Sequence, residues 1–138
     1  MAVRSKLIEQ VKQLLFLAPV SLTGSSEVYS VVIDRQKYAS AAIAVMVGTL
    51  TGSGTHSVAL KLYHNTANST SGGADSGLTF TGGPLVNATP LATLQAQLEG
   101  LNRYIYIGLT PTFGGSETAA LVAASITLGD AQDVEPVA

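Results

Sequence analysis

The side chains best suited to chemistry in this chain are two histidines and a few scattered acids. His56 and His64 are the only histidines, and on an extended strand a separation of eight residues spans about 27 Å. That distance is too long for two ligands of one metal ion, and no group of carboxylates accompanies either residue. The pattern favours surface histidines at strand ends, so we expect neither a metal site nor a cofactor.

Catalytic constellations are equally weak. A Ser-His-Asp triad can be assembled on paper from the many serines, either histidine, and Asp34 or Asp75, but nothing resembles the turn that presents an activated serine. A glycosidase needs two converging acids, whereas the nine acids here lie mostly in termini and turns. The chain has no cysteine, which excludes thiol chemistry. The sequence therefore predicts no enzyme and no catalytic residue.

Two further motifs have a structural and a functional interpretation. The segment Gly52–Ser57 nearly matches a dinucleotide fingerprint, but it lacks the third glycine and a strand is expected after it instead of a helix. A tight turn is the favoured interpretation. Tyr104 and Tyr106 share one face of a predicted strand, where packing in the core or in a subunit contact is favoured over stacking on a sugar. Together with Tyr63 they are the candidates for an exposed aromatic platform.

Asp34 and Arg103 are the charges best embedded in apolar strand contexts. We hypothesise that they pair with each other or cap nearby backbone and so fix the register of the fold. Two separate surface charges at strand ends are an equally open alternative.

Charge is scarce in the middle of the chain. Between Tyr38 and Leu98 the only charged residues are Lys61 and Asp75, and the whole chain carries 12% charged residues, about half the usual share. This suggests that much of the surface faces protein instead of water, with the neutral segments Thr49–Thr55 and Asn65–Pro90 as contact candidates. The net charge of −2 argues against nucleic acid. The longest near-apolar run, Ala39–Val47, is half the length of a membrane-spanning helix.

Two segments have helical spacing. Apolar residues recur at three- and four-residue steps over Val3–Leu15, which predicts a short helix or an extended arm that ends before Pro19. Leu91–Leu98 repeats the spacing before Gly100. We therefore divide the chain into an N-terminal arm, residues 1–20, and a β domain, residues 21–138.

The β domain consists of short strands with Gly-rich connections. This pattern predicts an all-β fold, a single β-sandwich of jelly-roll-like type. Thr51–Gly54 is expected to join two neighbouring strands as a tight hairpin, and Gly114-Gly115 is expected in the turn between the last two strands of the sheet. The expected strands are Val28–Ile33, Tyr38–Leu50, Val58–Tyr63, Leu78–Phe80, Arg103–Leu109 and Ala119–Leu128.

Several blocks, in their order, resemble a known family. They are an apolar segment ending in Leu17-Ala18-Pro19, the run Ile33–Ala41 leading into an apolar strand that ends at Gly48, the strand Asn102–Ile107, and the terminal Glu135-Pro136-Val137. This order is similar to that of the capsid decoration, or cement, proteins of tailed bacteriophages, which are encoded beside the major capsid protein. Asp75-Ser76-Gly77 matches the acidic turn of that family only in part.

The resemblance implies a viral structural protein without catalysis, made in the host cytoplasm and located in the virion on the capsid exterior. Its partners would be the major capsid protein and copies of itself, in a homotrimer. Arg4, Lys6 and Lys12 in the arm are the candidates for capsid contact, and deletion of the residues before Leu17 is expected to leave a folded oligomer. The alternative is a carbohydrate- or receptor-binding β domain on the phage head or tail.

Overall fold

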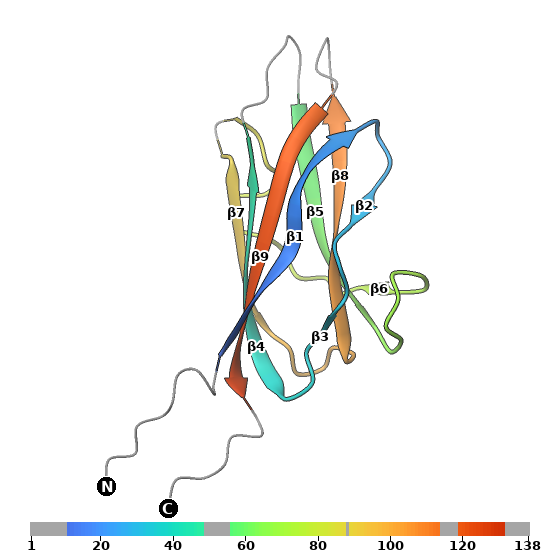
Figure 1. Cartoon of the computed structure of the whole chain (residues 1–138), viewed down its shortest axis with the longest axis vertical. Helices are drawn as coiled ribbons and strands as arrows, with labels where there is room; N and C mark the ends of the chain where they lie inside the picture. The colour runs from blue at the N-terminus through green and yellow to red at the C-terminus, as the bar shows by residue number, and fades with distance from the viewer. Residues whose placement is uncertain (1–10, 49–55, 88, 114–118, 132–138) are drawn as a thin grey trace, which may run out of the picture.

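The computed structural model of the chain describes residues 11–48, 56–87, 89–113 and 119–131. These residues form two antiparallel sheets packed face to face as a β-sandwich (Figure 1). The first sheet, sheet A, has the strand order β1-β9-β4-β7, and sheet B has the order β2-β8-β5-β6 with β3 also paired to β8. The strands are β1 (Lys12–Thr23), β2 (Val28–Tyr29), β3 (Ile33–Asp34), β4 (Tyr38–Val47), β5 (His56–Asn65), β6 (Ala74–Asp75), β7 (Leu91–Gln97), β8 (Tyr104–Phe113) and β9 (Ala119–Ala131).

The predicted all-β sandwich is confirmed, and its core follows from period-two patterning. Alternate residues of the long strands point between the sheets, and the central ones, such as Val45, Ile107 and Ile126, have no exposed surface. At about 25 cal/mol per Å² of apolar surface removed from water, this layer is the main source of stability. The jelly-roll-like path of the chain stays a prediction.

The helix predicted over Val3–Leu15 is wrong for the part of it that the structure describes. Residues from Lys12 onward form β1, which pairs with β9, so residues 12–20 of the expected arm belong to sheet A. Residues 1–10 lie outside the described part. Irregularities in pairing between Leu15 and Leu17 and between Leu17 and Val20 shift the inward positions. Leu14 lies on the inner side of β1 and Leu15 is exposed on its outer side, so apolar residues on both sides of the strand imitate helical spacing.

The helix predicted over Leu91–Leu98 is also wrong, because this segment contains β7. The inward residues are Ala92, Leu94, Ala96 and Leu98, at a strict period of two. Leu91 points outward and is 50% exposed. Two of the buried positions are alanines, so a pattern based on leucines alone missed the strand.

The hairpin predicted at Thr51–Gly54 is wrong as a strand pairing, and the last two strands do not share a sheet. β4 lies in sheet A and pairs with β7 and β9, whereas β5 lies in sheet B and pairs with β8 and β6. Likewise β8 and β9 lie in different sheets. The two Gly-rich segments therefore connect the sheets, whose separation is about 10 Å, although residues 49–55 and 114–118 themselves lie outside the described part. The expected strand Leu78–Phe80 is not a strand, and Val28–Ile33 is divided into β2 and β3.

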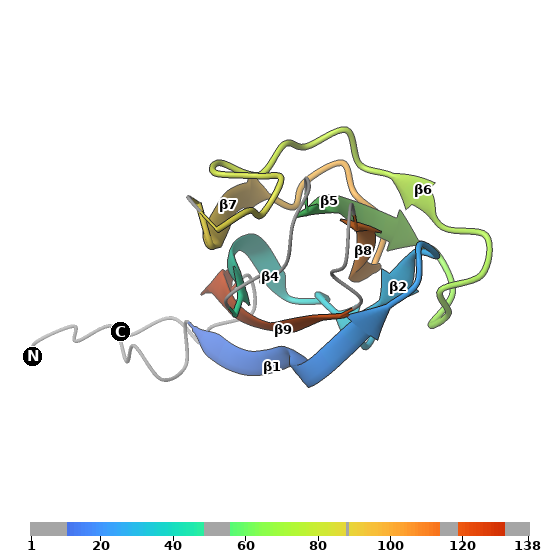
Figure 2. The same ribbon diagram turned by 90° about the horizontal axis from the view of Figure 1, so that it is seen from above.

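Backbone contacts join the two sheets along both sides. On one side, Leu85 exchanges two backbone hydrogen bonds with Val58 of β5, and Thr81 does the same with Thr93 of β7. Figure 2 shows this connection between β6 and β7 passing outside β5. On the other side, the Val31 N–H donates to the Phe16 carbonyl at 3.2 Å. These contacts therefore occupy parts of the free edges of β1, β5 and β7.

Candidate assembly surface

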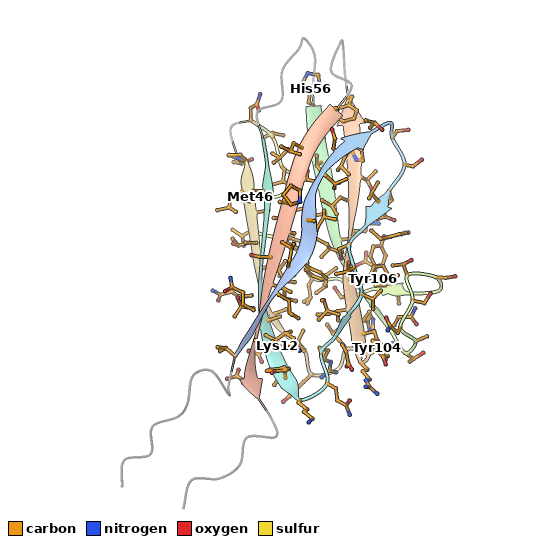
Figure 3. All side chains as sticks on the ribbon, viewed as in Figure 1. Lys12, Met46, His56, Tyr104 and Tyr106 are labelled. Atoms are coloured by element: carbon orange, nitrogen blue, oxygen red, sulfur yellow. The ribbon has the colours of Figure 1, made fainter. Side chains whose placement is uncertain are left out.

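The residues that suggested catalysis are dispersed. His56 and His64 stand at opposite ends of β5, and Figure 3 shows His56 near one end of the molecule. The Nδ1 atom of His64 accepts a hydrogen bond from the Asn102 N–H at 2.9 Å, so this histidine fixes a turn. Among the described residues there is no group of three or more histidines, cysteines or acids that could hold a metal ion. In the same residues there is no helix long and apolar enough to cross a membrane.

The acids of the hypothetical triad have structural partners. Asp34 binds Arg103, and Asp75 accepts a hydrogen bond from the Gly77 N–H at 2.9 Å and lies 4.0 Å from the Lys61 ammonium. Of the near-dinucleotide segment, residues 52–55 lie outside the described part, while His56 and Ser57 begin a strand. A phosphate site of the Rossmann type needs a helix N-terminus at this position, where this chain has a strand.

The hypothesis that Asp34 pairs with Arg103 is confirmed. The Arg103 Nε donates to one carboxylate oxygen at 3.0 Å and Nη2 donates to the other at 2.7 Å. Hydrogen bonding from Arg103 is the main cause that lowers the pKa of Asp34. The Arg103 guanidinium also lies 5.1 Å from the centre of the Tyr104 ring. Both charged side chains are about half exposed, so this pair fixes register more than it adds stability.

Two of the three candidates for an exposed aromatic platform, Tyr63 and Tyr106, pack against each other instead. Tyr63 and Tyr106 are stacked with centroids 5.2 Å apart, and Tyr29 meets both edge-on. Tyr106 is only 1% exposed, and its hydroxyl donates to the Thr70 carbonyl at 2.9 Å. A buried ring has no free face for a sugar, so packing, the favoured interpretation of Tyr106, is confirmed. We call Tyr29, Tyr63 and Tyr106 the tyrosine cluster.

Glu27 ties the tyrosine cluster together, a role that no sequence pattern indicated. Its two carboxylate oxygens accept hydrogen bonds from the Tyr29 hydroxyl at 2.9 Å and the Tyr63 hydroxyl at 2.7 Å. Burial, and then the bond to Glu27, raise the pKa of Tyr63 above its usual value. The carboxylate fits because Gly108 lies beneath it, where a Cβ would stand 2.4 Å from the Glu27 Oε2 atom.

The charge-poor segment Asn65–Pro90 is largely exposed but is tied to its own chain at several points. Asn65 is 7% exposed, and its amide donates to the Ser69 and Ser71 carbonyls at 2.8 and 2.9 Å. This folded loop covers Tyr106, and Thr81 and Leu85 are bound to strands of the two sheets. The prediction that this segment contacts other subunits stays untested. Thr49–Thr55 lies outside the described residues.

Of the three predicted capsid-contact residues, the structure describes Lys12 alone. It begins β1 opposite the end of β9, pairs with Leu128 and is exposed. Figure 3 places it at the end of the molecule away from His56. Arg4 and Lys6 lie outside the described residues.

The most distinctive surface is the outer side of sheet A, where the outward positions of four strands form a plane without charge. We call it the neutral face. Strand registers place its members side by side: Met46 lies between Leu91 and Ala123, and Ala44 lies between Thr93 and Ser125. Its residues are Gln13, Leu15 and Ser21 of β1, Leu121, Ala123, Ser125, Thr127 and Gly129 of β9, Ser40, Ala42, Ala44 and Met46 of β4, and Leu91, Thr93, Gln95 and Gln97 of β7.

Large apolar side chains on the neutral face are exposed to solvent. Leu15 is 61% exposed, Leu121 56%, Met46 52% and Leu91 50%. They account for four of the seven large hydrophobic residues that are exposed in the described part of the chain. Between them, small side chains leave a shallow hollow of about 250 Å³ over Ala42, Ala44 and Ser125.

The charged side chains lie on the other sheet or at the rim of this face. Glu27, Lys61 and Asp75 lie on or beside sheet B, and Asp130 borders the neutral face where β9 ends. Figure 3 shows Met46 and Tyr106 on opposite sides of the molecule. The scarcity of charge was visible in the sequence. The sequence did not show that the uncharged positions gather on one face, because that face combines four strands that are distant in the chain.

Comparisons with known proteins give distant structural similarity alone. No family model matches the chain, and no curated protein matches it. Among solved structures, the SPBc2 prophage-derived protein YomS is similar with a TM-score of 0.44 and 14% sequence identity, over 86% of this chain and 93% of that one.

Proposed function

We propose that this protein is a non-catalytic structural component of a bacteriophage particle, which decorates the outside of the head and stabilises the shell. The observation that carries the proposal is the neutral face, a charge-free sheet surface with large apolar side chains open to solvent. Exposed apolar patches of this kind mark surfaces that bind protein. The resemblance of the sequence to capsid decoration proteins is the reason for choosing the phage head as the assembly to which this protein binds.

The mechanism would be multivalent cross-linking. Each subunit would contact its own copies, in a trimer as the resemblance implies, and through them several subunits of the shell. Because each further contact forms at high effective concentration once the first is made, the number of contacts matters more than the strength of any one. Opening of the shell would then require many contacts to be lost together.

The end of the molecule where β1 begins is the proposed site of capsid contact. Lys12 is exposed there, and Arg4 and Lys6 precede it in the sequence. Because β1 belongs to sheet A from Lys12 onward, a contact through residues 1–10 leaves the sandwich undisturbed. Basic side chains at the edge of such a contact would chiefly speed association and set orientation.

The test is reconstitution on heads assembled without this protein. Added protein should co-sediment with the heads at a fixed ratio to the major capsid protein and raise the temperature at which they release DNA. The triple variant Arg4→Glu, Lys6→Glu, Lys12→Glu should bind more weakly, while Lys61→Glu on sheet B serves as the matched control. Heads that neither bind the protein nor gain thermal resistance would contradict the decoration role.

A further inference from the structure

We infer that the neutral face is covered by a second copy of this chain. The inference rests on the self-association in the proposed function and names one surface that carries it. Contact between the same face of two copies is two-fold and joins them as a pair, so the trimer implied by the resemblance would need a second contact. The inference needs no capsid to be tested, because a contact between copies forms in the isolated protein.

An antiparallel sheet with one side in water normally carries polar and charged residues on that side. In sheet A the outward positions of β4, from Ser40 to Met46, are serine, alanine, alanine and methionine. The neighbouring positions of β9 are equally small or apolar, from Leu121 to Gly129. The outer side of sheet B differs, since Lys61, Asp75 and Glu27 lie on or beside it. The neutral face is therefore uncharged, and about half of its members are serine, threonine or glutamine, the mixed composition of an interface between subunits.

Charge identifies the occupant as a copy of the chain. A partner with a charged surface would lose hydration on binding and find no opposite charge on this face, which costs free energy. The same face of a second copy brings no charge, so two copies meet without repulsion or an unpaired ion.

The size of the face also fits. Four strands about 4.8 Å apart and about ten residues long cover roughly 600 Å², close to the ~800 Å² per partner of a stable interface. Its relief supplies complementary shapes. The exposed side chains of Leu15 and Met46 project beside the hollow over Ala42 and Ala44, so ridges of one copy can fill the hollow of another.

The first experiment measures the mass of the purified protein by sedimentation velocity or light scattering at micromolar concentration. The unmodified chain should form an oligomer. Met46→Glu, at an outward and half-exposed position, should reduce the mass to that of one 14.1 kDa chain. Ala59→Glu, at an exposed position on the outer side of sheet B, is the matched control and should keep the oligomer. Circular dichroism should show the same β signal for all three proteins.

A cross-linking experiment keeps the inference testable if Met46→Glu does not fold. Since the chain has no cysteine, Ala44→Cys introduces a single thiol at the centre of the neutral face. A bismaleimide longer than the ~10 Å separation of packed sheets should then join two chains, whereas Ala59→Cys should not be joined.

Three results would overturn the inference: a monomeric unmodified chain, an oligomer that persists in Met46→Glu, or cross-linking through Ala59→Cys instead of Ala44→Cys. Failure of the decoration role is a separate result. A protein that assembles through the neutral face but leaves heads unbound would retain this inference and contradict the proposed function.

Discussion

Arg103 binds Asp34 through two parallel hydrogen bonds, at 3.0 and 2.7 Å, across 69 positions of sequence. Asp34 also accepts a hydrogen bond from the Gln36 N–H at 3.0 Å, which shapes the turn into β4. One carboxylate therefore sets both the pairing of β3 with β8 and the direction in which the chain leaves sheet B for sheet A.

Asp34→Asn is expected to lower stability slightly at neutral pH, since the pair is exposed and screened. Arg103 lowers the pKa of Asp34 in the folded protein below its unfolded value of about 3.9. The stabilisation is therefore present above pH ~4 and is lost as the pH falls through the lower, folded pKa. Urea unfolding at several pH values should show the difference between the two proteins shrinking in acid.

The matched control for that prediction is Asp75→Asn, whose carboxylate lies 4.0 Å from the Lys61 ammonium. It should change stability less than Asp34→Asn does at pH 7. Equal effects of the two variants, at every pH, would mean that the bidentate geometry contributes nothing.

The tyrosine cluster should titrate late in alkali. The hydrogen bond to Glu27 raises the pKa of Tyr29, and burial raises the pKa of Tyr63 and Tyr106, above the usual value of about 10. Stability that depends on these protonated phenols is present below pH ~10 and is lost as the pH rises through the folded pKa values.

Glu27→Gln tests this directly, because it removes the negative charge and keeps the shape. Absorbance titration at alkaline pH should show Tyr29 and Tyr63 ionising earlier in the variant than in the unmodified protein. Identical titration curves would show that the Glu27 carboxylate does not control these phenols.

Gly108→Ala is expected to destabilise the fold by about 1–3 kcal/mol, the usual cost of overpacking. The new Cβ would stand 2.4 Å from the Glu27 Oε2 atom and 2.7 Å from the Tyr63 ring. In Gly48→Ala, the control, the nearest atom would be at an ordinary contact distance of 3.7 Å. Thermal unfolding should separate the two variants, and a fully stable Gly108→Ala would contradict the packing of Glu27 over β8.

Deletion of the residues before Leu17 was expected from the sequence to leave a folded oligomer, and the structure moves the boundary of that deletion. Removal of residues 1–10 should leave the sandwich folded, because β1 begins at Lys12. Removal through Phe16 takes away a side chain with no exposed surface and should cost about 3–5 kcal/mol or more. Circular dichroism melting curves of the two truncations test this. If both are equally stable, the first half of β1 is dispensable.

The sequence predicted the fold class and several strands because period-two alternation survives in β5, β8 and β9. It failed where another feature disturbed that period. Apolar residues on both sides of β1, such as Leu14 and Leu15, made it resemble a helix, and the alanines at Ala92 and Ala96 concealed β7. Long-range pairing was also hidden, since Gly-rich segments that suggested hairpins instead carry the chain between sheets.

The candidate surface was predicted in character but not in place. The charge-poor middle of the chain indicated contact with other proteins. Its loop Asn65–Asp75 instead contacts the same chain, since it folds over Tyr106. The neutral face is built from β1, β9, β4 and β7, and only the strand order makes Leu15, Ser125, Ala44 and Thr93 neighbours. Local sequence cannot supply that order.

The most direct measurement is a cryo-electron microscopy reconstruction of the particle that contains this chain. We expect density for the sandwich on the outside of the head, with the neutral faces of neighbouring copies turned toward one another and Lys12 toward the shell. A chain absent from the shell, or one whose Met46 and Leu121 remain open to solvent on every copy, would contradict this expectation.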